Sequence, residues 1–249
     1  MATRLKLIVA YDGEPFSGWQ SQPNGNGVQD HLEAAFKQIC AMPLRVHGAG
    51  RTDAGVHALA QCAHVDVPAK RYSPERWVSA LNGLLPPTIR IMSCREAPST
   101  FHARLSATGK IYRYRIWNRG VLPPLENGRA WHVRDPLDRS RLAAVARLFV
   151  GRHDFAAFAA NRGVPVIETV RTIRRVSVQS SGALISIDFE GEGFLYKMVR
   201  MMVGALVEVG AGKSAADEIR SRLGSGRKPG SLNRTVAPAA GLYLVRVRY

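Results

Sequence analysis

Cysteine is scarce in this chain, and its spacing excludes the folds that depend on it. The three cysteines are Cys40, Cys62 and Cys94. Their number is odd and no two of them form a C-x-x-C pair, whereas disulfide frameworks use even numbers and structural zinc sites use closely spaced pairs. We therefore expect three buried thiols in a reducing compartment.

Long apolar runs are also lacking. The stretch over residues 201–207 is strongly apolar, but it lies between Arg200 and Glu208 and is far shorter than the ~20 residues of a membrane-spanning helix. The first residues alternate between apolar and polar types, which is typical of a strand and not of a signal peptide. The sequence therefore predicts a cytoplasmic protein that is not held in a membrane.

Acidic residues are few compared with basic ones. The chain has 19 Asp and Glu against 35 Lys and Arg, which gives a net charge of +16 and a pI near 10.6. Such an excess favours a polyanionic partner, with nucleic acid ahead of an anionic membrane. The 46% hydrophobic content and the length of 249 residues suit one large domain or two small ones.

Cofactor motifs are missing from the one glycine-rich loop, HGAGRTDAGVH at residues 47–57. A P-loop would need Gly-Lys-Ser/Thr here, and a dinucleotide-binding loop would need a third glycine where the chain has Asp53. His47, His57 and His64 flank this aspartate, but their spacing matches no zinc pattern, and His57 and His64 would lie on opposite faces of one strand. The sequence predicts neither a nucleotide cofactor nor a metal.

The same loop offers a carboxylate on a permissive backbone. Its glycines allow sharp turns and close approach of another molecule, and Asp53 follows Arg51 by two residues between strand-like segments. A carboxylate held in this way can act as a nucleophile or a general base. The alternative is a tight turn in which Asp53 only binds nearby backbone N–H groups.

Apolar periodicity predicts a β-α-β-β-α-β order in the first half of the chain, which is the split βαβ arrangement of ferredoxin-like domains. The expected elements are a strand over 4–11, a helix over 28–40, strands over 44–47 and 57–67, a helix that begins at Ser73 and Pro74 and carries Trp77, Leu81 and Leu84 inward, and a strand over 88–94.

The second half repeats strands and helices, and we predict two domains, residues 1–105 and 106–249. The expected elements are a strand over 110–118, a pairing segment over 129–134, a helix around 142–149, strands over 169–178 and 184–189, helices from about Leu195 and over 215–223, and a strand over 242–247.

Aromatic and basic side chains alternate along the strand that starts at Lys110. Tyr112 and Tyr114 would share one face, and Arg113 and Arg115 the other. Aromatic rings on a sheet can stack on unpaired bases while arginines contact phosphates. A half-buried strand whose arginines reach water is the alternative.

One basic residue, Arg200, lies near the start of an otherwise apolar helix. A charge in such surroundings needs an opposite charge or access to water. An ion pair with a carboxylate in a cleft would be functional, whereas a solvated helix face would not.

Residues 48–57, GAGRTDAGVH, are similar to the catalytic signature of the tRNA pseudouridine synthase A family, with Asp53 at the position of its essential aspartate. The resemblance runs through the whole chain in the family's order. Its further segments are YDG at 11–13, GWQ at 18–20, VQ at 28–29, FHAR at 101–104, YRY at 112–114, MVR at 198–200 and GLYL at 241–244.

This resemblance implies an α+β fold in which two ferredoxin-like halves join into one mixed, mainly antiparallel sheet, with helices on one face and an RNA-binding cleft on the other. It also implies a homodimer that isomerises uridine to pseudouridine at positions 38, 39 and 40 of the tRNA anticodon stem-loop. The reaction needs no cofactor and no metal, because the base only leaves its sugar, turns and rejoins it through carbon 5.

The resemblance also assigns roles to residues of this chain. Asp53 is the expected nucleophile, Arg200 its ion-pair partner, and Tyr112 a residue that stacks on the base and moves a proton. The residues expected to bind the RNA substrate are Arg51, Arg71, Phe101, His102, Arg104 and Tyr112.

Two other functions fit parts of this sequence. A non-catalytic RNA-binding protein would release no tritium from 5-labelled uridine in tRNA. A metal-dependent nuclease that used Asp12, Asp53 and the nearby histidines would lose its activity in EDTA and would shorten the tRNA.

Overall fold

The computed structural model describes residues 2–68, 72–160, 168–224 and 235–249. The chain divides into two compact units, one made of Met1–Thr108 with Tyr243–Tyr249 and the other of Gly109–Leu242. The predicted boundary between residues 105 and 106 lies close to this division. The last strand differs from the prediction, because nearly all of it belongs to the first unit.

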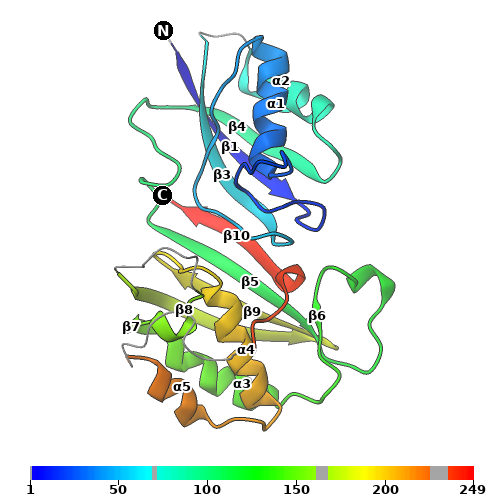
Figure 1. Cartoon of the computed structure of the whole chain (residues 1–249), viewed down its shortest axis with the longest axis vertical. Helices are drawn as coiled ribbons and strands as arrows, with labels where there is room; N and C mark the ends of the chain where they lie inside the picture. The colour runs from blue at the N-terminus through cyan, green and yellow to red at the C-terminus, as the bar shows by residue number, and fades with distance from the viewer. Residues whose placement is uncertain (1, 69–71, 161–167, 225–234) are drawn as a thin grey trace. The chain divides into compact units, whose positions relative to one another are not determined.

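The first unit is a four-stranded sheet with two helices on one face (Figure 1). The strands are β1 (Thr3–Tyr11), β3 (His57–Val67), β4 (Ile89–Ala97) and β10 (Leu242–Arg248), in the order β4-β1-β3-β10, with the short β2 (His47–Gly48) also paired to β3. Strand β1 runs antiparallel to both β3 and β4, whereas β10 runs parallel to β3. This element order confirms the predicted β-α-β-β-α-β pattern.

The two helices of this unit begin and end at signals that the sequence carries. Helix α1 (Val28–Cys40) has the predicted bounds, and α2 (Pro74–Leu84) begins after Ser73, whose side chain accepts a hydrogen bond from the Arg76 N–H. Both are amphipathic, and they meet at Phe36 and Trp77, whose ring centroids are 5.5 Å apart. The buried side chains of this core include Leu5, Leu7, Val9, Leu32, Phe36, Trp77 and Leu81.

One predicted core residue is wrong. Leu84, the last residue of α2, is 41% exposed, whereas the next residue, Leu85, is buried. The chain turns to an extended conformation at Leu85, whose N–H donates to the Leu81 carbonyl. The helical spacing no longer applies beyond the end of the helix, so the capping residue Leu85 takes the buried position in place of Leu84.

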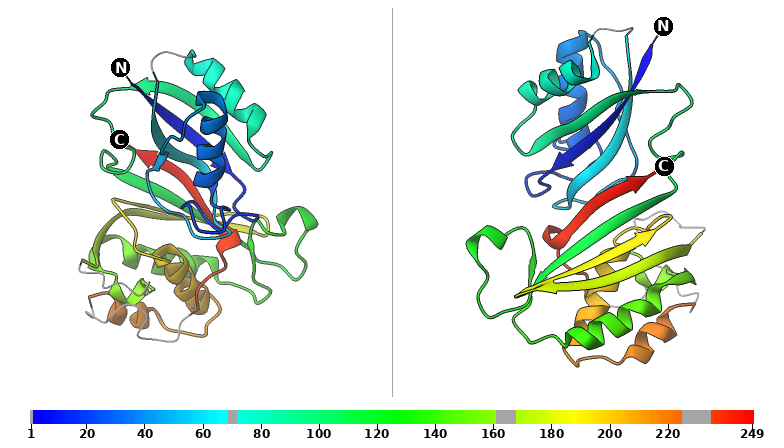
Figure 2. Two further views of the ribbon diagram at one scale, coloured as in Figure 1. Left: turned by 45° about the horizontal axis from the view of Figure 1, so that its top comes forward. Right: turned by 180° about the vertical axis from the view of Figure 1, so that it is seen from behind.

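The second unit consists of strands and helices of its own part of the chain, Gly109–Leu242. Its strands are β5 (Gly109–Trp117), β7 (Gly151–Asp154), β8 (Val170–Ser181) and β9 (Leu184–Gly191), in the order β5-β9-β8-β7, with the short β6 (Trp131–His132) parallel to β5. The helices are α3 (Arg139–Ala146), α4 (Met198–Gly210) and α5 (Ala216–Arg222). The reverse view in Figure 2 shows β8 and β9 on one side of this unit and its helices on the other.

Helix α4 begins three residues later than predicted. Lys197 has a φ of 58°, in the left-handed region, and an α-helix cannot continue through such a residue. The apolar pattern before it, which includes Leu195, therefore belongs to a loop. Strand β7 was not predicted, since four residues that begin with Gly151 carry too little alternation.

The α+β class is confirmed by ten strands and five α-helices among the described residues. In that part of the chain, every helix is too short or too polar to cross a bilayer.

Candidate active site

The loop that carries Asp53 connects β2 to β3, and its backbone is bound at both ends. Ala49 N–H donates to the Cys62 carbonyl at 2.8 Å, and the Val56 N–H closes a turn on the Asp53 carbonyl at 3.1 Å. The fully buried Gln61 donates from its side-chain amide to the Gly50 carbonyl at 2.8 Å. These contacts hold the loop at the end of β3, a strand that lies between β1 and β10 in the sheet.

The residue before the aspartate is anchored most strongly. Thr52 is buried, its hydroxyl lies 2.8 Å from the Tyr11 hydroxyl, and its carbonyl accepts from the Trp19 N–H at 3.1 Å. Burial raises the pKa of Tyr11, so this phenol stays protonated and can bond to Thr52. Asp53 itself is partly exposed. Arg51 and Ala54, which flank Thr52 and Asp53, are exposed. The loop thus fixes the backbone and leaves the carboxylate accessible.

Glycines in the loop and in the segment over residues 11–20 allow the two to pack directly on each other. A Cβ on Gly13 would overlap the Val56 carbonyl oxygen, and one on Gly48 would overlap the Trp19 ring. Gly18 has a φ of +98°, and a Cβ there would lie 2.5 Å from the Thr52 carbonyl oxygen. Side chains at these three positions would push the loop away from the segment over residues 11–20.

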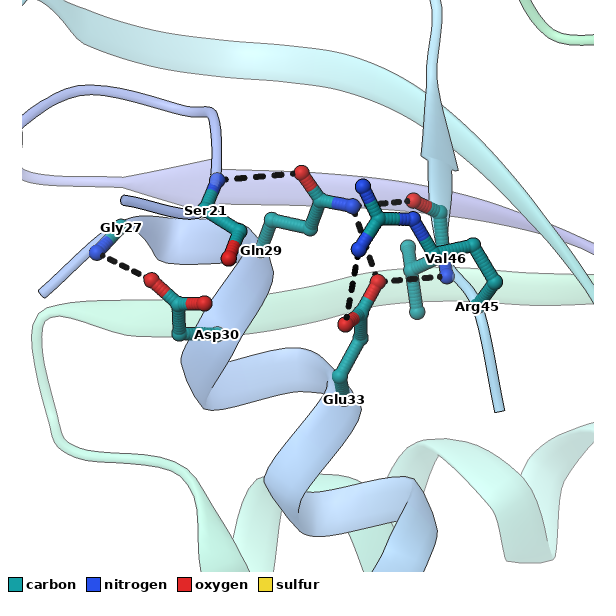
Figure 3. A network of polar contacts seen from close by, with 7 residues as sticks. All are labelled: Ser21, Gly27, Gln29, Asp30, Glu33, Arg45 and Val46. Carbon is teal, nitrogen blue, oxygen red and sulfur yellow. Dashed lines mark hydrogen bonds and ion pairs between the residues drawn. The ribbon is translucent and has the colours of Figure 1, made fainter. Parts of the chain in front are cut away.

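A polar network connects α1 to the segment that enters the loop (Figure 3). The buried Gln29 accepts from the Ser21 N–H at 3.1 Å and donates to the Val46 carbonyl at 3.0 Å. Glu33 accepts from the same Gln29 amide at 2.8 Å and from the Val46 N–H at 3.0 Å. Arg45 adds a 3.4 Å contact to the Glu33 carboxylate. The backbone of Val46 is therefore held by two side chains of α1.

This network explains why the strand predicted over residues 44–47 is reduced to the two residues of β2. Both backbone groups of Val46 bind side chains of α1, so they are not available for a strand ladder.

The other end of the loop is held by the last strand of the chain. His57, the first residue of β3, accepts at Nδ1 from the Gly13 N–H at 3.0 Å, and its ring stacks on Tyr243 of β10 with centroids 4.6 Å apart. The Asp12 carboxylate lies 3.1 Å from the same Nδ1 atom. His57 is thus held by Gly13 and Tyr243, and Asp12 lies beside it. No group of three or more His, Cys, Asp or Glu side chains in the described part of the chain is arranged to hold a metal.

The residues predicted to bind RNA from the first unit differ in exposure. Arg51 and Arg104 are exposed, whereas Phe101 and His102 are half-buried. The Phe101 ring packs against Tyr249 with centroids 5.0 Å apart, and its centroid lies 4.5 Å from the Lys6 ammonium. Phe101 therefore contributes to the packing of the segment that carries Arg104. Arg71 lies outside the described residues.

The second unit holds the other two predicted catalytic residues. Tyr112 is buried on β5 and packs edge-to-face on Phe194 with centroids 5.0 Å apart. Arg200, on the first turn of α4, donates from Nε to the Ala237 carbonyl at 2.7 Å. Asp53 belongs to one unit and these residues to the other, so the catalytic set of all three stays a prediction.

The two arginines that alternate with the tyrosines of β5 bind carboxylates of their own unit. Arg113 makes a two-point contact with Asp188 at 2.8 Å for each bond, and Arg115 binds Glu126 at 2.9 Å. Burial raises the pKa of Tyr114, whose hydroxyl donates to the Pro238 carbonyl at 2.7 Å. The two interpretations of this strand had its arginines contact phosphates or reach water, and neither included the carboxylates that pair with them here.

Sequence reasoning missed most of the supporting residues. Tyr11, Trp19, Gln29 and Gln61 all bind the loop or its entry segment across at least eleven residues of sequence. The available signal was the clustering of polar and glycine residues at 11–13, 18–20 and 28–29, which are the segments that carry the family resemblance.

This chain is similar to a known protein family and to named proteins. The family model described as tRNA pseudouridine synthase matches residues 7–105 and 145–249. A curated protein named tRNA pseudouridine synthase A from Akkermansia muciniphila is 46% identical over 253 residues, covering 99% of this chain and 95% of the relative. A relative of the same name from Solidesulfovibrio magneticus is 47% identical, covering 99% of this chain and 91% of the relative.

Solved structures resemble this chain only weakly. The crystal structure of a Cbf5-Nop10-Gar1 complex has a TM-score of 0.39 and 11% identity, covering 96% of this chain and 57% of that chain. A likeness at this level supports no conclusion about fold or function. The family match and the curated relatives are decisive: the chain belongs to the tRNA pseudouridine synthase A family, whose members are isomerases that act on RNA.

Proposed function

We propose that this enzyme converts uridine to pseudouridine at positions 38, 39 and 40 of the tRNA anticodon stem-loop, with Asp53 as the nucleophile. The supporting observation is the loop itself. The anchored Thr52 precedes Asp53, whose carbonyl closes the turn with Val56, and the aspartate remains partly exposed. A carboxylate on a well-held backbone at the end of a strand can attack a bound nucleoside with little reorganisation.

The reaction is an isomerisation, so every atom is retained or exchanged with water. The bond between C1′ of the ribose and N1 of uracil breaks, the base turns, and a bond forms between C1′ and C5. The proton on C5 leaves and N1 ends with a proton. Neither an oxidant nor a metal enters this balance.

The target base must leave the stem before this chemistry starts. Unpairing and unstacking a nucleotide costs roughly a few kcal/mol, which contacts between basic side chains and phosphates can offset. In this proposal Arg51, Arg71 and Arg104 supply phosphate contacts, and Phe101 and His102 contribute to the binding surface as part of the segment that carries Arg104. Tyr112 stacks on the flipped base and moves a proton.

Arg200 is proposed to pair with Asp53 and to keep the carboxylate ionised, since a nearby guanidinium favours the charged form. The bond from its Nε to the Ala237 carbonyl would orient the guanidinium in this role.

The decisive experiment compares wild-type protein with Asp53→Asn. We expect the Asp53→Asn protein to bind tRNA within about twofold of wild type and to lose at least about 10³-fold in tritium release from 5-labelled uridine, because the substitution removes the nucleophile and keeps the side-chain shape. Asp217→Asn, on the exposed surface of α5, is the matched control and should keep full activity.

Site specificity is tested with stem-loops that carry uridine at one position only. Tritium release from substrates with uridine at 38, 39 or 40, and none from a stem-loop lacking uridine at all three, is the expected result. Undiminished release by the Asp53→Asn protein would refute the nucleophile, and release from the stem-loop that lacks uridine at these positions would refute the site.

The proposal also concerns the assembly and its place in the cell. We propose that the working form is a homodimer in the cytoplasm, where tRNA is modified. Light scattering should then give a mass near twice 27.3 kDa, and a monomer at working concentration would refute the dimer.

A further inference from the structure

The segment over residues 101–106 has an unusual set of backbone hydrogen bonds. It follows β4, precedes β5 and forms neither helix nor strand. Three successive N–H groups in it donate to imidazole nitrogens: Ala103 to His64 Nδ1 at 3.1 Å, and Arg104 and Leu105 to His102 Nδ1 at 3.1 and 3.2 Å. Buried or turned backbone N–H groups need such acceptors, so two histidines determine the conformation here.

These histidines belong to a cluster of three. His47 of β2 stacks on its strand partner His64, with ring centroids 4.9 Å apart and an interplanar angle of 18°. His102 lies 4.6 Å from His64 and 5.8 Å from His47. The cluster therefore joins the strand that enters the Asp53 loop to the segment that carries Arg104.

An Nδ1 atom accepts a hydrogen bond only when it carries no proton. Burial is the main cause that lowers the pKa of His64 to about 4, and His47, His102 and Arg4 lower it further, against a weaker opposite effect of Asp66. The pKa of His47 is also lowered, mainly by burial, with His102 and Arg45 adding to this effect and Glu33 and Asp66 opposing it. His47 and His64 are thus kept in the neutral form, in which a ring nitrogen can accept a hydrogen bond.

With its N–H groups bound to the two histidines, the segment turns toward solvent after Ala103. Ala103 is fully buried, and its carbonyl accepts from the Tyr249 hydroxyl at 2.7 Å. The two residues that follow are exposed, Leu105 by 77%. The chain therefore leaves the core at Ala103 and presents Arg104 to solvent while its N–H remains bound to His102.

We propose that His102 and His64 are positioning residues for tRNA binding, whose Nδ1 atoms hold Ala103–Leu105 in the conformation that presents Arg104 to the RNA. This inference rests on the proposed function, since it takes the bound polyanion to be tRNA. It predicts that loss of the His102 acceptor weakens the affinity for tRNA through Arg104 and has no comparable effect on the chemical step.

The test uses two substitutions at His102. His102→Leu removes the acceptor, whereas His102→Asn places an amide oxygen where Nδ1 lies and restores it. We expect His102→Leu to raise the Kd for tRNA and the KM about tenfold with kcat within about twofold. His102→Asn should recover the wild-type Kd within about twofold. His132→Leu, a histidine of the second unit bound to the Arg119 carbonyl, is the control.

A double-mutant cycle separates positioning from mere stability. If His102 acts through Arg104, the variant with both His102→Leu and Arg104→Ala should bind tRNA no more weakly than Arg104→Ala alone. Additive losses, a His102→Asn protein as weak as His102→Leu, or an unchanged Kd with only a lower Tm would overturn the inference. Because Kd is measured without turnover, a failure of the proposed chemistry would appear separately, as wild-type protein that binds tRNA and releases no tritium.

Discussion

The aspartate of the candidate site depends on neighbours that are remote in sequence. The local pattern identifies Asp53 and its glycines, and the resemblance gives the aspartate its role. That Thr52 binds the Tyr11 hydroxyl, 41 residues away, has no local signal, because period-two alternation places Tyr11 in the core without indicating its partner. The sequence therefore indicates the candidate residue, Asp53, but not the residues that hold its loop.

At the same scale, His64 should make stability depend on pH. Its pKa is lowered to about 4 in the folded protein, against about 6.5 in the unfolded chain. The unfolded state therefore binds more protons between these values, and the free energy of unfolding falls as pH decreases from about 6.5 to about 4. His64→Asn keeps an acceptor at the Nδ1 position and removes the titration.

As pH decreases over this range, we expect the free energy of unfolding of the wild type to fall by about 1–3 kcal/mol more than that of His64→Asn. Urea unfolding at pH 7, 5.5 and 4.5 measures it, with His153→Asn of the second unit as the control. Parallel pH profiles for wild type and His64→Asn would contradict the assignment.

Among the elements, α1 does more than cover a sheet. Its bounds were predicted at both ends by apolar spacing, but the same spacing gives no hint that Gln29 and Glu33 bind Val46 (Figure 3). Residues 44–46 have a strand-like pattern but form no strand, because these side chains bind the backbone of Val46. Elements with strong periodicity were thus predictable, whereas short ones were decided by side-chain contacts between elements.

Removing this connection should disturb the loop. Gln29→Leu fills similar volume but leaves the Ser21 N–H and the Val46 carbonyl without their partner, which costs about 2 kcal/mol. We expect urea unfolding to show this loss, and kcat for tritium release to fall about tenfold with a Kd for tRNA near wild type.

Gln38→Ala, at an exposed position of the same helix, is the matched control and should change neither quantity. If Gln29→Leu lowers stability but leaves kcat unchanged, the geometry of the Asp53 loop does not depend on α1.

For the molecule as a whole, the composition already indicates an RNA partner, because 35 basic residues stand against 19 acidic ones. It should also make binding sensitive to salt, because each phosphate contact releases condensed counterions. We expect the Kd for tRNA to rise at least about tenfold between 50 and 200 mM salt, and Arg104→Ala to reduce the slope of log Kd against log salt by about one.

Filter binding across a salt series checks this, with Arg139→Ala in the second unit, whose side chain binds the Gly182 carbonyl, as the control. A salt-independent Kd, or an equal slope for Arg104→Ala and wild type, would remove Arg104 from the RNA contacts.

The pairing of β10 with β3 gives the chain an order of assembly. Residues 243–249 belong to the first unit, although the whole of Gly109–Leu242 precedes them. During translation β10 is synthesised after the second unit. Until then the first unit is incomplete, because β3 lacks its parallel partner strand. Only then can Tyr243 cover His57 at the end of the Asp53 loop. A nascent chain stalled before β10 would thus already carry every residue assigned to catalysis and still lack the strand that completes the loop's support.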